Sequence, residues 1–379
     1  MGAFFLSIAM LIPMLPLYLR DRGLSTARIG ILVGIFSIGV LLVRPWVGRA
    51  ADTIGRRPLL LLGAGIAALA GPLYIWATAL MGLAALRLVH GAGLSAFTTG
   101  STTLVADLAP AGRRTEYLSY LSTAGILAFA LGPVAAIEIA ARWGYTALFV
   151  SVGASAAVSV LFGLLLSAPA PVVDDGRSLD YRSVILRRQV LIPTATLLLV
   201  TLAHGGVFTF LPLLLEERLA FNIGFFFFAY SAASLVIRLA AGRISRLWGD
   251  GPLVWGGLVG FAGALALLPL IRDWTTMFLV AVLYGASFAL YQPAVYGLVA
   301  NAATDRTRGM AFSVLLAAFD AGMSLGALVL GLVVDGVGIP TTFLGLALVP
   351  LVAAALFVGY LGWQPDPGAC AMPEEVPVP

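Results

Sequence analysis

Long apolar stretches separated by short polar clusters run along nearly the whole chain. An α-helix rises 1.5 Å per residue, so about 20 apolar residues cross the hydrocarbon core of a bilayer. The pattern therefore predicts an all-α polytopic membrane protein with twelve membrane-spanning helices. Their expected ranges are 3–19, 29–47, 58–78, 80–106, 117–139, 144–166, 190–215, 222–242, 252–271, 275–300, 309–334 and 340–362.

The composition points to the same class of protein. Of the 379 residues, 60% are hydrophobic and only 11% are charged, and the mean hydropathy is +1.02. Globular proteins carry about 25% charged residues, so this chain lacks the polar side chains needed to cover a surface that faces water. We therefore expect the lipid bilayer to be its main surrounding.

The distribution of the basic residues predicts the orientation. All 22 basic residues are arginines, and the segments that join helices 2–3, 4–5, 6–7, 8–9 and 10–11 hold thirteen of them, against six on the opposite side. The positive-inside rule places the side with thirteen arginines in the cytoplasm. We expect a multi-pass protein of the cytoplasmic (inner) membrane with both termini in the cytoplasm, and no nucleic-acid partner.

The sequence also matches itself at a constant offset of 194 residues. A period of six helices, an even number, gives both halves the same orientation, as in transporters built from two parallel repeats. We expect a six-helix bundle over 1–166, a cytoplasmic linker over 167–189, a second bundle over 190–363 and a disordered tail over 364–379. The matched pairs include Arg44 and Arg238, Gly48 and Gly242, Gly55 and Gly249, Gly132 and Gly326, and Gly144 and Gly338.

One motif carries a family resemblance. The segment Gly48-Arg-Ala-Ala-Asp52-Thr-Ile-Gly55-Arg56-Arg57 resembles the loop 2–3 signature of the major facilitator superfamily: Gly, three residues, Asp, two residues, Gly and two basic residues. The glycines permit a tight turn, and a carboxylate at this spacing can pair with arginine or face the amino end of a helix.

Further stretches extend the resemblance toward drug-exporter-like bacterial members. Pro13 and Pro16 resemble a double-proline element of helix 1, and Arg87 with the glycines after it resembles an arginine motif of helix 4. Gly132-Pro133 resembles only the core of the antiporter signature in helix 5, because Ala128 and Ala135-Ala136 stand where that signature has glycines. This departure weakens the case for antiport.

The resemblance implies a twelve-helix fold of two pseudo-symmetric bundles and a charged gate on the cytoplasmic side. It implies gating roles for the first copy of the motif, namely Gly48, Asp52, Gly55, Arg56 and Arg57, together with Asp107 at the end of helix 4. The second copy, with its charges reversed, contributes Gly242, Arg246, Gly249 and Asp250. Close helix packing is expected at Gly132, Pro133, Gly322 and Gly326.

Ionisable residues inside the predicted helices are costly, so each is a candidate for function. Arg87 and Asp320 are candidates for proton coupling. Arg87 could instead be a structurally paired or snorkelling arginine, and Asp320 could contact a cationic substrate or make a structural hydrogen bond. Glu138 is a third candidate, or it merely reaches the interface.

Aromatic and polar residues of the predicted central helices are candidates for lining a substrate cavity. The structural alternative for each is packing between helices, which is the commoner role of a lone membrane histidine. The candidates are His90, His204, Phe208, Tyr284, Tyr291 and Gln292.

No enzyme constellation stands out. Two histidines and a single cysteine, Cys370, do not build a metal site, and a chain without lysine has no phosphate-binding loop of the Gly-x-x-x-x-Gly-Lys type. We therefore expect a secondary transporter without cofactor or metal, functional as a monomer, whose partners are a small solute and protons. Export of a hydrophobic or amphipathic solute by proton antiport is the leading hypothesis. Proton-coupled or facilitated uptake of a sugar or another metabolite is the alternative.

Overall fold

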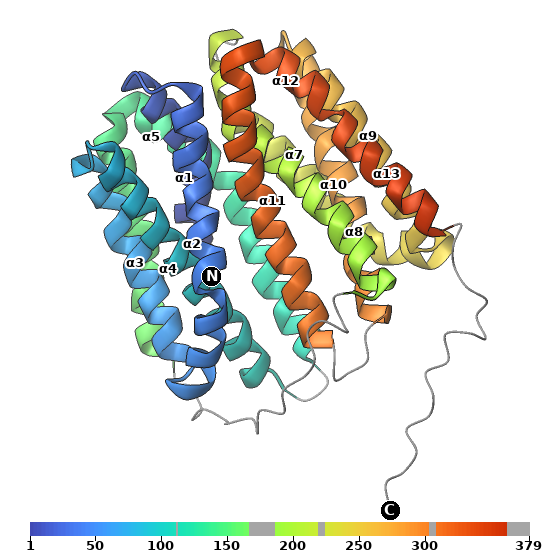
Figure 1. Ribbon diagram of the computed structural model, residues 1–379. Coiled ribbons are helices and arrows are strands. Elements are labelled where there is room, and N and C mark those ends of the chain that lie inside the picture. The colour runs from blue at the N-terminus through green and yellow to red at the C-terminus, as the bar shows by residue number, and fades with distance from the viewer. Residues whose placement is uncertain (111–112, 167–185, 219–223, 303–307, 362–379) are drawn as a thin grey trace, which may run out of the picture.

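The computed structural model describes residues 1–110, 113–166, 186–218, 224–302 and 308–361, and the backbone of these ranges forms helices joined by short connections (Figure 1). The predicted linker at 167–189 and the tail at 364–379 fall largely or wholly outside the described residues, so the predicted domain boundaries stay predictions. The helices are α1 (Gly2–Asp21), α2 (Thr26–Thr53), α3 (Arg56–Trp76), α4 (Leu80–Leu108), α5 (Arg114–Leu165), α7 (Arg188–Arg218), α8 (Gly224–Trp248), α9 (Asp250–Leu267), the short 3₁₀ turn η1 (Leu268–Leu270), α10 (Trp274–Ala302), α11 (Arg308–Val337), α12 (Ile339–Leu346) and α13 (Leu348–Leu361).

Eleven helices among the described residues are long and apolar enough to cross a membrane. One of them, α5, has an apolar stretch of 46 residues, which is about twice the length that one crossing needs. The backbone of α5 breaks at Gly144, where φ is 79° and ψ is 175°, so α5 makes two passes. The predicted all-α polytopic architecture is thereby confirmed.

The repeat in the sequence reappears in the backbone conformation. Gly55 and Gly249 begin α3 and α9 with φ of 96° and 79°. Gly144 and Gly338 break α5 and precede α12 with φ of 79° and 80°. Left-handed φ values favour glycine because it has no Cβ. The offset of 194 residues therefore relates the turns of the two halves as well as their sequences.

The helices pack as two groups that meet along three contacts. In the first group α1 packs against α5, and α4 packs against α2 and α3. In the second group α7 packs against α11 and α13, and α10 packs against α8 and α9. The groups meet where α2 packs against α11, α5 against α8 and α1 against α7 (Figure 1). The repeat relates the α2–α11 contact to the α8–α5 contact, which makes the interface pseudo-symmetric.

Equivalent close helix contacts occur in both halves. A Cβ added at Gly91 of α4 would lie 1.9 Å from the carbonyl oxygen of Phe36 in α2. The equivalent Cβ at Gly285 of α10 would lie 2.3 Å from the carbonyl oxygen of Tyr230 in α8. Both glycines let two helix backbones approach more closely than any side chain would allow.

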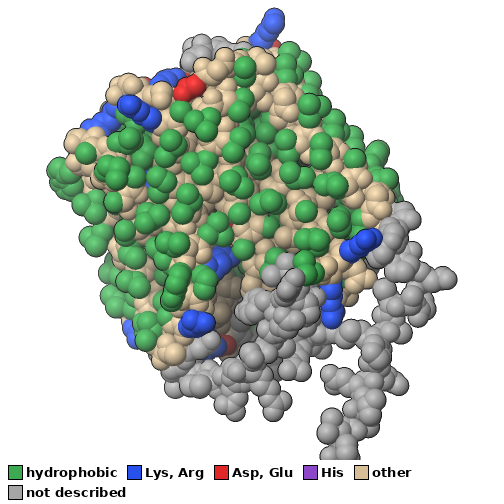
Figure 2. All heavy atoms as spheres, viewed as in Figure 1, with side chains coloured by type: hydrophobic (Ala, Val, Ile, Leu, Met, Phe, Trp, Pro, Cys, Tyr) green, Lys and Arg blue, Asp and Glu red, His purple; other side chains and the backbone are tan. Residues whose placement is uncertain are grey.

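Apolar side chains also cover the outside of the helix bundle. Leu42, Leu69, Leu161 and Leu239 are all more than half exposed, and Figure 2 shows hydrophobic side chains over most of one face. Such a surface is stable in lipid, so the chain is a multi-pass membrane protein. We name the two ends of the bundle by their connections: the α1–α2 end (Arg22–Ser25) and the α2–α3 end (Ile54–Gly55).

Candidate functional site

An ion pair joins the two halves within the bundle. Arg44 of α2 and Asp320 of α11 approach to 2.5 Å between Nη2 and Oδ2. Arg44 lies about 13 Å from the α2–α3 end of its helix, at 1.5 Å per residue. Its side chain is 27% exposed and that of Asp320 is 18% exposed, so the charge pair is largely buried between helices of both halves.

A second arginine lies near this pair. Arg238 of α8 donates a short hydrogen bond to Oε1 of Gln292 in α10, and Nε2 of Gln292 donates to the hydroxyl of Tyr296 over 3.4 Å. Arg238, Asp320 and Arg44 all lie close enough to the Tyr296 hydroxyl to act on it electrostatically. We call these five residues the central polar cluster: Arg44, Arg238, Gln292, Tyr296 and Asp320.

The sequence identified only part of this cluster. Asp320 and Gln292 were candidates, whereas Arg44 and Arg238 served only as markers of the repeat, and Tyr296 was missed. Tyr296 follows Gln292 by one helical turn and so shares its face of α10, which is the signal that could have found it. Figure 2 shows a hollow in the face of the molecule where the two halves meet below its centre, with basic side chains at its edge.

Arg87 is buried within the first half and bonds to backbone. Its Nε donates to the carbonyl oxygen of Leu32 over 3.0 Å, and Nη2 donates to that of Val33 over 3.1 Å. The guanidinium also lies 4.3 Å from the centre of the Phe36 ring. In the part of the chain that the structure describes, no carboxylate lies within ion-pair distance of Arg87. Its contacts therefore tie α4 to α2.

His90 lies in the core of the first half. Its side chain is fully buried, its Nδ1 is 3.3 Å from the hydroxyl of Tyr74, and its ring packs edge-on against Phe36 at 5.3 Å. All of these neighbours belong to α2 and α3. These contacts agree with the packing alternative for His90, and the cavity role of this residue stays a prediction.

The contacts of four candidates of the second half also agree with the packing alternative, and their cavity roles stay predictions. His204 Nδ1 is 2.8 Å from the hydroxyl of Tyr284, and its ring stacks on Phe288 at 4.4 Å and lies 4.2 Å from Phe208. The hydroxyl of Tyr291 donates to Oγ1 of Thr196 over 3.0 Å. Phe208, Tyr284 and Tyr291 are buried with His204 among α7, α8, α9 and α10, whereas Gln292 belongs to the central polar cluster.

Glu138 lies at the surface of α5. Its carboxylate is 3.1 Å from Arg142, one turn further along the same helix, and the two side chains are 45% and 67% exposed. An exposed pair of this kind is screened by solvent and contributes little to stability. This position agrees with the alternative that Glu138 reaches the membrane interface and does not take part in proton coupling.

The first copy of the motif forms the α2–α3 turn. Gly55 begins α3, and Arg56 pairs with Asp107 at the end of α4. Arg57 donates from Nε to the carbonyl oxygen of Gly163 over 3.1 Å and from Nη2 to that of Leu164 over 2.7 Å, and so caps the end of α5. Gly48 has no other atom near its missing Cβ, and the side chain of Asp52 lies outside the described residues.

The second copy forms the equivalent turn with a different polar contact. Gly249 begins α9, and the carboxylate of Asp250 accepts a hydrogen bond of 2.6 Å from the hydroxyl of Ser245. The surroundings of Gly242 and the side chain of Arg246 lie outside the described residues. The glycine turn is thus common to both halves, whereas the Arg56–Asp107 pair belongs to the first half.

The remaining candidates lie at close helix contacts. A Cβ at Gly132 of α5 would lie 2.7 Å from the Cβ of Ala9 in α1. In α11, a Cβ at Gly322 or at Gly326 would lie 2.0 Å from atoms of α7, namely Oγ1 of Thr201 and the carbonyl oxygen of Leu202. Pro133 lies within α5 beside Gly132.

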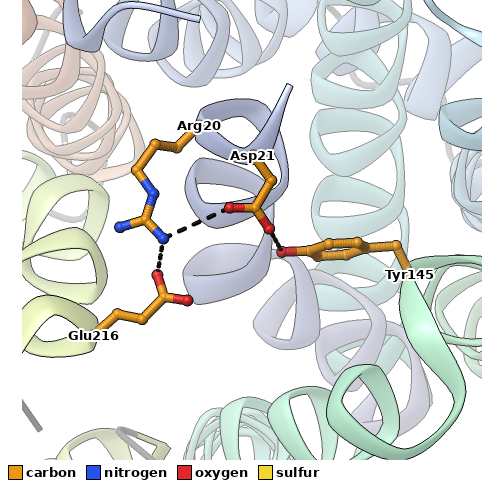
Figure 3. Close-up of polar contacts among 4 residues, drawn as sticks. All are labelled: Arg20, Asp21, Tyr145 and Glu216. Atoms are coloured by element: carbon orange, nitrogen blue, oxygen red, sulfur yellow. Dashed lines mark hydrogen bonds and ion pairs between the residues drawn. The ribbon is translucent and has the colours of Figure 1, made fainter. Parts of the chain in front are cut away.

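Polar contacts that the sequence did not predict join the halves at the α1–α2 end. Arg20 of α1 pairs with Glu216 of α7 and lies 3.6 Å from Asp21, and Asp21 accepts a hydrogen bond of 2.7 Å from the hydroxyl of Tyr145 (Figure 3). Arg20 and Glu216 are not equivalent in the repeat. The only sequence signal was the presence of opposite charges near the ends of two central helices.

A second connection at this end links α11 to the start of α2. The carboxylate of Asp335 accepts hydrogen bonds from the Thr26 hydroxyl and, over 3.1 Å, from the backbone N–H of Ala27. These donors belong to the first turn of α2, where backbone N–H groups lack partners within the helix. Further from this end along the same two helices, the hydroxyl of Ser324 in α11 donates to the carbonyl oxygen of Gly34 in α2 over 2.7 Å. The two halves are therefore joined at the α1–α2 end.

Comparisons with known proteins agree with this architecture. A family model described as the Major Facilitator Superfamily matches residues 1–272 and again residues 220–371. The uncharacterized MFS-type transporter YhhS of Escherichia coli (strain K12) is 26% identical over 368 residues, which cover 94% of this chain and 89% of YhhS. The crystal structure of the nucleoside transporter NupG superposes with a TM-score of 0.81 at 16% identity, over 96% of this chain and 97% of NupG, and so shows the same fold.

A more local similarity concerns the quinolone resistance protein NorA of Staphylococcus aureus. The two sequences are 29% identical over 129 residues, which cover 34% of this chain and 33% of NorA. The match thus spans about a third of the length of that relative.

Proposed function

This chain belongs to the major facilitator superfamily, and we propose on that basis that it exports a small amphipathic solute in exchange for protons. Members of this family are transporters and not enzymes. The ion pair between Arg44 and Asp320 carries the proposal, because it places a carboxylate at the contact between the two moving halves. We further propose that the protein acts as a monomer.

The proposed coupling follows from the charges of the pair. An ionised Asp320 attracts Arg44 and so holds α11 to α2. A proton on Asp320 removes this attraction and leaves the guanidinium of Arg44 without a counter-ion in a partly desolvated place, which is costly. Because both side chains are partly exposed, we propose that protons reach Asp320 through the space between the two halves. Protonation would thus change how firmly the two halves hold together at this point.

The proposed cycle uses the two ends of the bundle in turn. The excess of arginines at the α2–α3 end supports a cytoplasmic position for that end and for both termini, in the cytoplasmic membrane. The α1–α2 end is joined by Arg20–Glu216 and by Asp335, which supports an inward-facing state. In the opposite state we propose that Asp52, Arg56 and Asp107 close the cytoplasmic end.

Export is supported by the relative NorA, which is named for quinolone resistance, although the match covers a third of that protein. Proton coupling in either direction has a driving force, because each charge that crosses a potential of 100 mV contributes about 2.3 kcal/mol. An amphipathic solute suits the site, because the polar side chains of the cluster adjoin an aromatic pair, Tyr296 and Phe312, with ring centres 6.0 Å apart.

A second candidate function is proton-coupled uptake, and one observation favours it. The central polar cluster holds two arginines and one carboxylate, so an anionic solute would be attracted to it. Such a solute beside Asp320 would favour a proton on that carboxyl group and would not displace it. Solute binding and protonation of Asp320 would then strengthen each other, as the transport of both in the same direction requires.

Purified protein in liposomes that contain a pH-sensitive dye tests the proposal. A pH gradient is imposed, and a quinolone, uridine and a sugar are supplied in turn. Export predicts that substrate movement in one direction drives proton movement in the other, with no flux in protein-free liposomes. Proton and substrate movement in the same direction would support uptake, and substrate movement without any proton movement would refute both forms of coupling.

A further inference from the structure

The two arginines of the central polar cluster have different partners. Arg44 faces the carboxylate of Asp320, whereas Arg238 faces the neutral amide oxygen of Gln292. Among the residues that the structure describes, no carboxylate lies within ion-pair distance of Arg238. Its guanidinium offers five N–H groups, and its buried Nε has no hydrogen-bond partner. Among the described residues, Arg238 therefore has a positive charge that no carboxylate neutralises and an N–H donor that is not used in a hydrogen bond.

The repeat explains why no carboxylate of the described residues pairs with Arg238. Residues 44 and 238 are equivalent, and both lie about 13–15 Å from the α2–α3 ends of their helices. The residue equivalent to Asp320 in the first half is Ile126. One side of the pseudo-symmetric interface thus has a matched charge pair, and the other has an arginine alone. An unmatched cation inside a membrane protein is costly unless an anion compensates it.

The surroundings of Arg238 suit an anionic group on an amphipathic molecule. Gln292 and Tyr296 extend the polar surface from Arg238 toward Arg44, so a planar oxyanion at Arg238 would have further polar groups beside it. Arginine binds carboxylates through two parallel hydrogen bonds, which a guanidinium with free donors can supply. The aromatic rings of Tyr296 and Phe312 lie next to this surface and could receive an apolar portion.

We infer that Arg238 binds a carboxylate or another oxyanion carried by the transported solute, which makes the substrate an amphipathic organic anion. This inference rests on the proposed function as a carrier, and an anionic substrate would favour the uptake alternative over exchange, because an anion near Asp320 favours a proton on that carboxyl group. The inference gives Arg238 a role in specificity, whereas Asp320 and Arg44 have the role in coupling.

A matched pair of fluorescent probes tests the inference. Dansylglycine and dansylglycinamide share one aromatic group and differ in an anionic carboxylate against a neutral amide. Each is titrated into purified protein held in nanodiscs of phosphatidylcholine, and binding is followed by dansyl fluorescence. We expect the dissociation constant of the carboxylate to be at least about tenfold lower than that of the amide, because an ionised acceptor bonds more strongly to arginine.

Substitutions of Arg238 test whether this side chain causes the preference for dansylglycine over dansylglycinamide. Arg238→Gln should raise the dissociation constant of dansylglycine about tenfold and leave that of the amide unchanged, while Arg238→Lys keeps part of the preference through its charge. Arg243→Gln is the matched control, because Arg243 is an exposed arginine on the same helix and should leave both constants unchanged. Size-exclusion chromatography confirms that each variant is folded.

Four results would overturn the inference. The first three are equal binding of both probes, absence of saturable dansylglycine binding to the folded protein, and an unchanged preference in Arg238→Gln. The fourth is an equal loss of binding of both probes in Arg238→Gln, which would show that Arg238 has a structural role. The liposome experiment keeps this test separate from the proposed function. Selective anion binding without proton-coupled flux would refute coupling alone, and coupled flux without anion preference would refute only the anion site.

Discussion

Arg44 of α2 and Asp320 of α11 form an ion pair that joins the two halves of the chain, with Nη2 and Oδ2 2.5 Å apart. The amino-half residue equivalent to Asp320 is Ile126, so the pair exists on one side of the interface only. A single carboxylate in such a place is well suited to link the charge state of the protein to the contact between its halves.

The first prediction concerns this carboxylate. Asp320→Asn should reduce proton flux at least tenfold, because an amide does not gain or lose a charge by protonation in the relevant pH range. Substrate binding by the folded variant should persist, and size-exclusion chromatography is needed to establish folding, because Arg44 loses its counter-ion. Proton flux in liposomes is the measurement. Glu138→Gln is the control, because that exposed residue pairs with Arg142 within one helix. Full coupling in Asp320→Asn would remove this residue from the mechanism.

The second prediction assigns a structural role to Arg87. Its guanidinium bonds to the carbonyl oxygens of Leu32 and Val33, and each hydrogen bond of a charged group contributes about 1.5–3 kcal/mol. Arg87→Gln should lower the thermal unfolding temperature by several degrees while the ratio of protons to substrate stays unchanged. A variant that unfolds normally but loses coupling would restore Arg87 as a proton-coupling residue.

The third prediction concerns the α1–α2 end. The side chains of Thr26 and Asp335 are in hydrogen-bond contact, so cysteines at both positions should form a disulfide under mild oxidation. With Cys370 replaced by serine, this cross-link should stop transport by holding the α1–α2 end closed, and reduction should restore transport. The two single-cysteine variants should be insensitive to oxidation. Continued transport by fully cross-linked protein would show that this end need not open.

The fourth prediction concerns the repeated turns. Gly144 and Gly338 adopt φ of 79° and 80°, and their added Cβ atoms would meet nothing closer than 3.9 Å, so the cost of alanine is purely conformational. Each substitution should destabilise the protein by about 1–3 kcal/mol. Gly256→Ala and Gly263→Ala are matched controls in open space within α9, where alanine should stabilise by up to about 1 kcal/mol. Thermal unfolding measures both sets, and equal effects in the two sets would contradict the argument.

The fold could be predicted because its physical determinants are local and repeated. Each membrane crossing needs a long apolar stretch, and each connection concentrates polar residues, so hydropathy located all twelve passes. The repeat of 194 residues located the turns as well, because Gly55 and Gly249 meet the same backbone requirement in each half. In this respect local sequence was sufficient.

The candidate site was predicted less completely, because burial inside one bundle and burial between two bundles look alike in sequence. His90 and His204 were plausible cavity residues, yet each bonds to a tyrosine of its own half. Arg44 stands out in the sequence only as a matched position of the repeat, although it lies opposite Asp320, 276 positions further along the chain by their residue numbers.

The sequence by itself determined that the chain crosses a membrane in two homologous sets of helices, since that depends on hydrophobicity and on local backbone requirements. Only the tertiary structure decided which charges meet. Arg44 pairs with Asp320 and Arg20 with Glu216, whereas among the described residues Arg238 bonds to the amide of Gln292 and to no carboxylate. The packing of the helices determines these partners. The sequence shows which residues are charged. Which partner neutralises each charge depends on distances between side chains, and only the packing of the helices sets these distances.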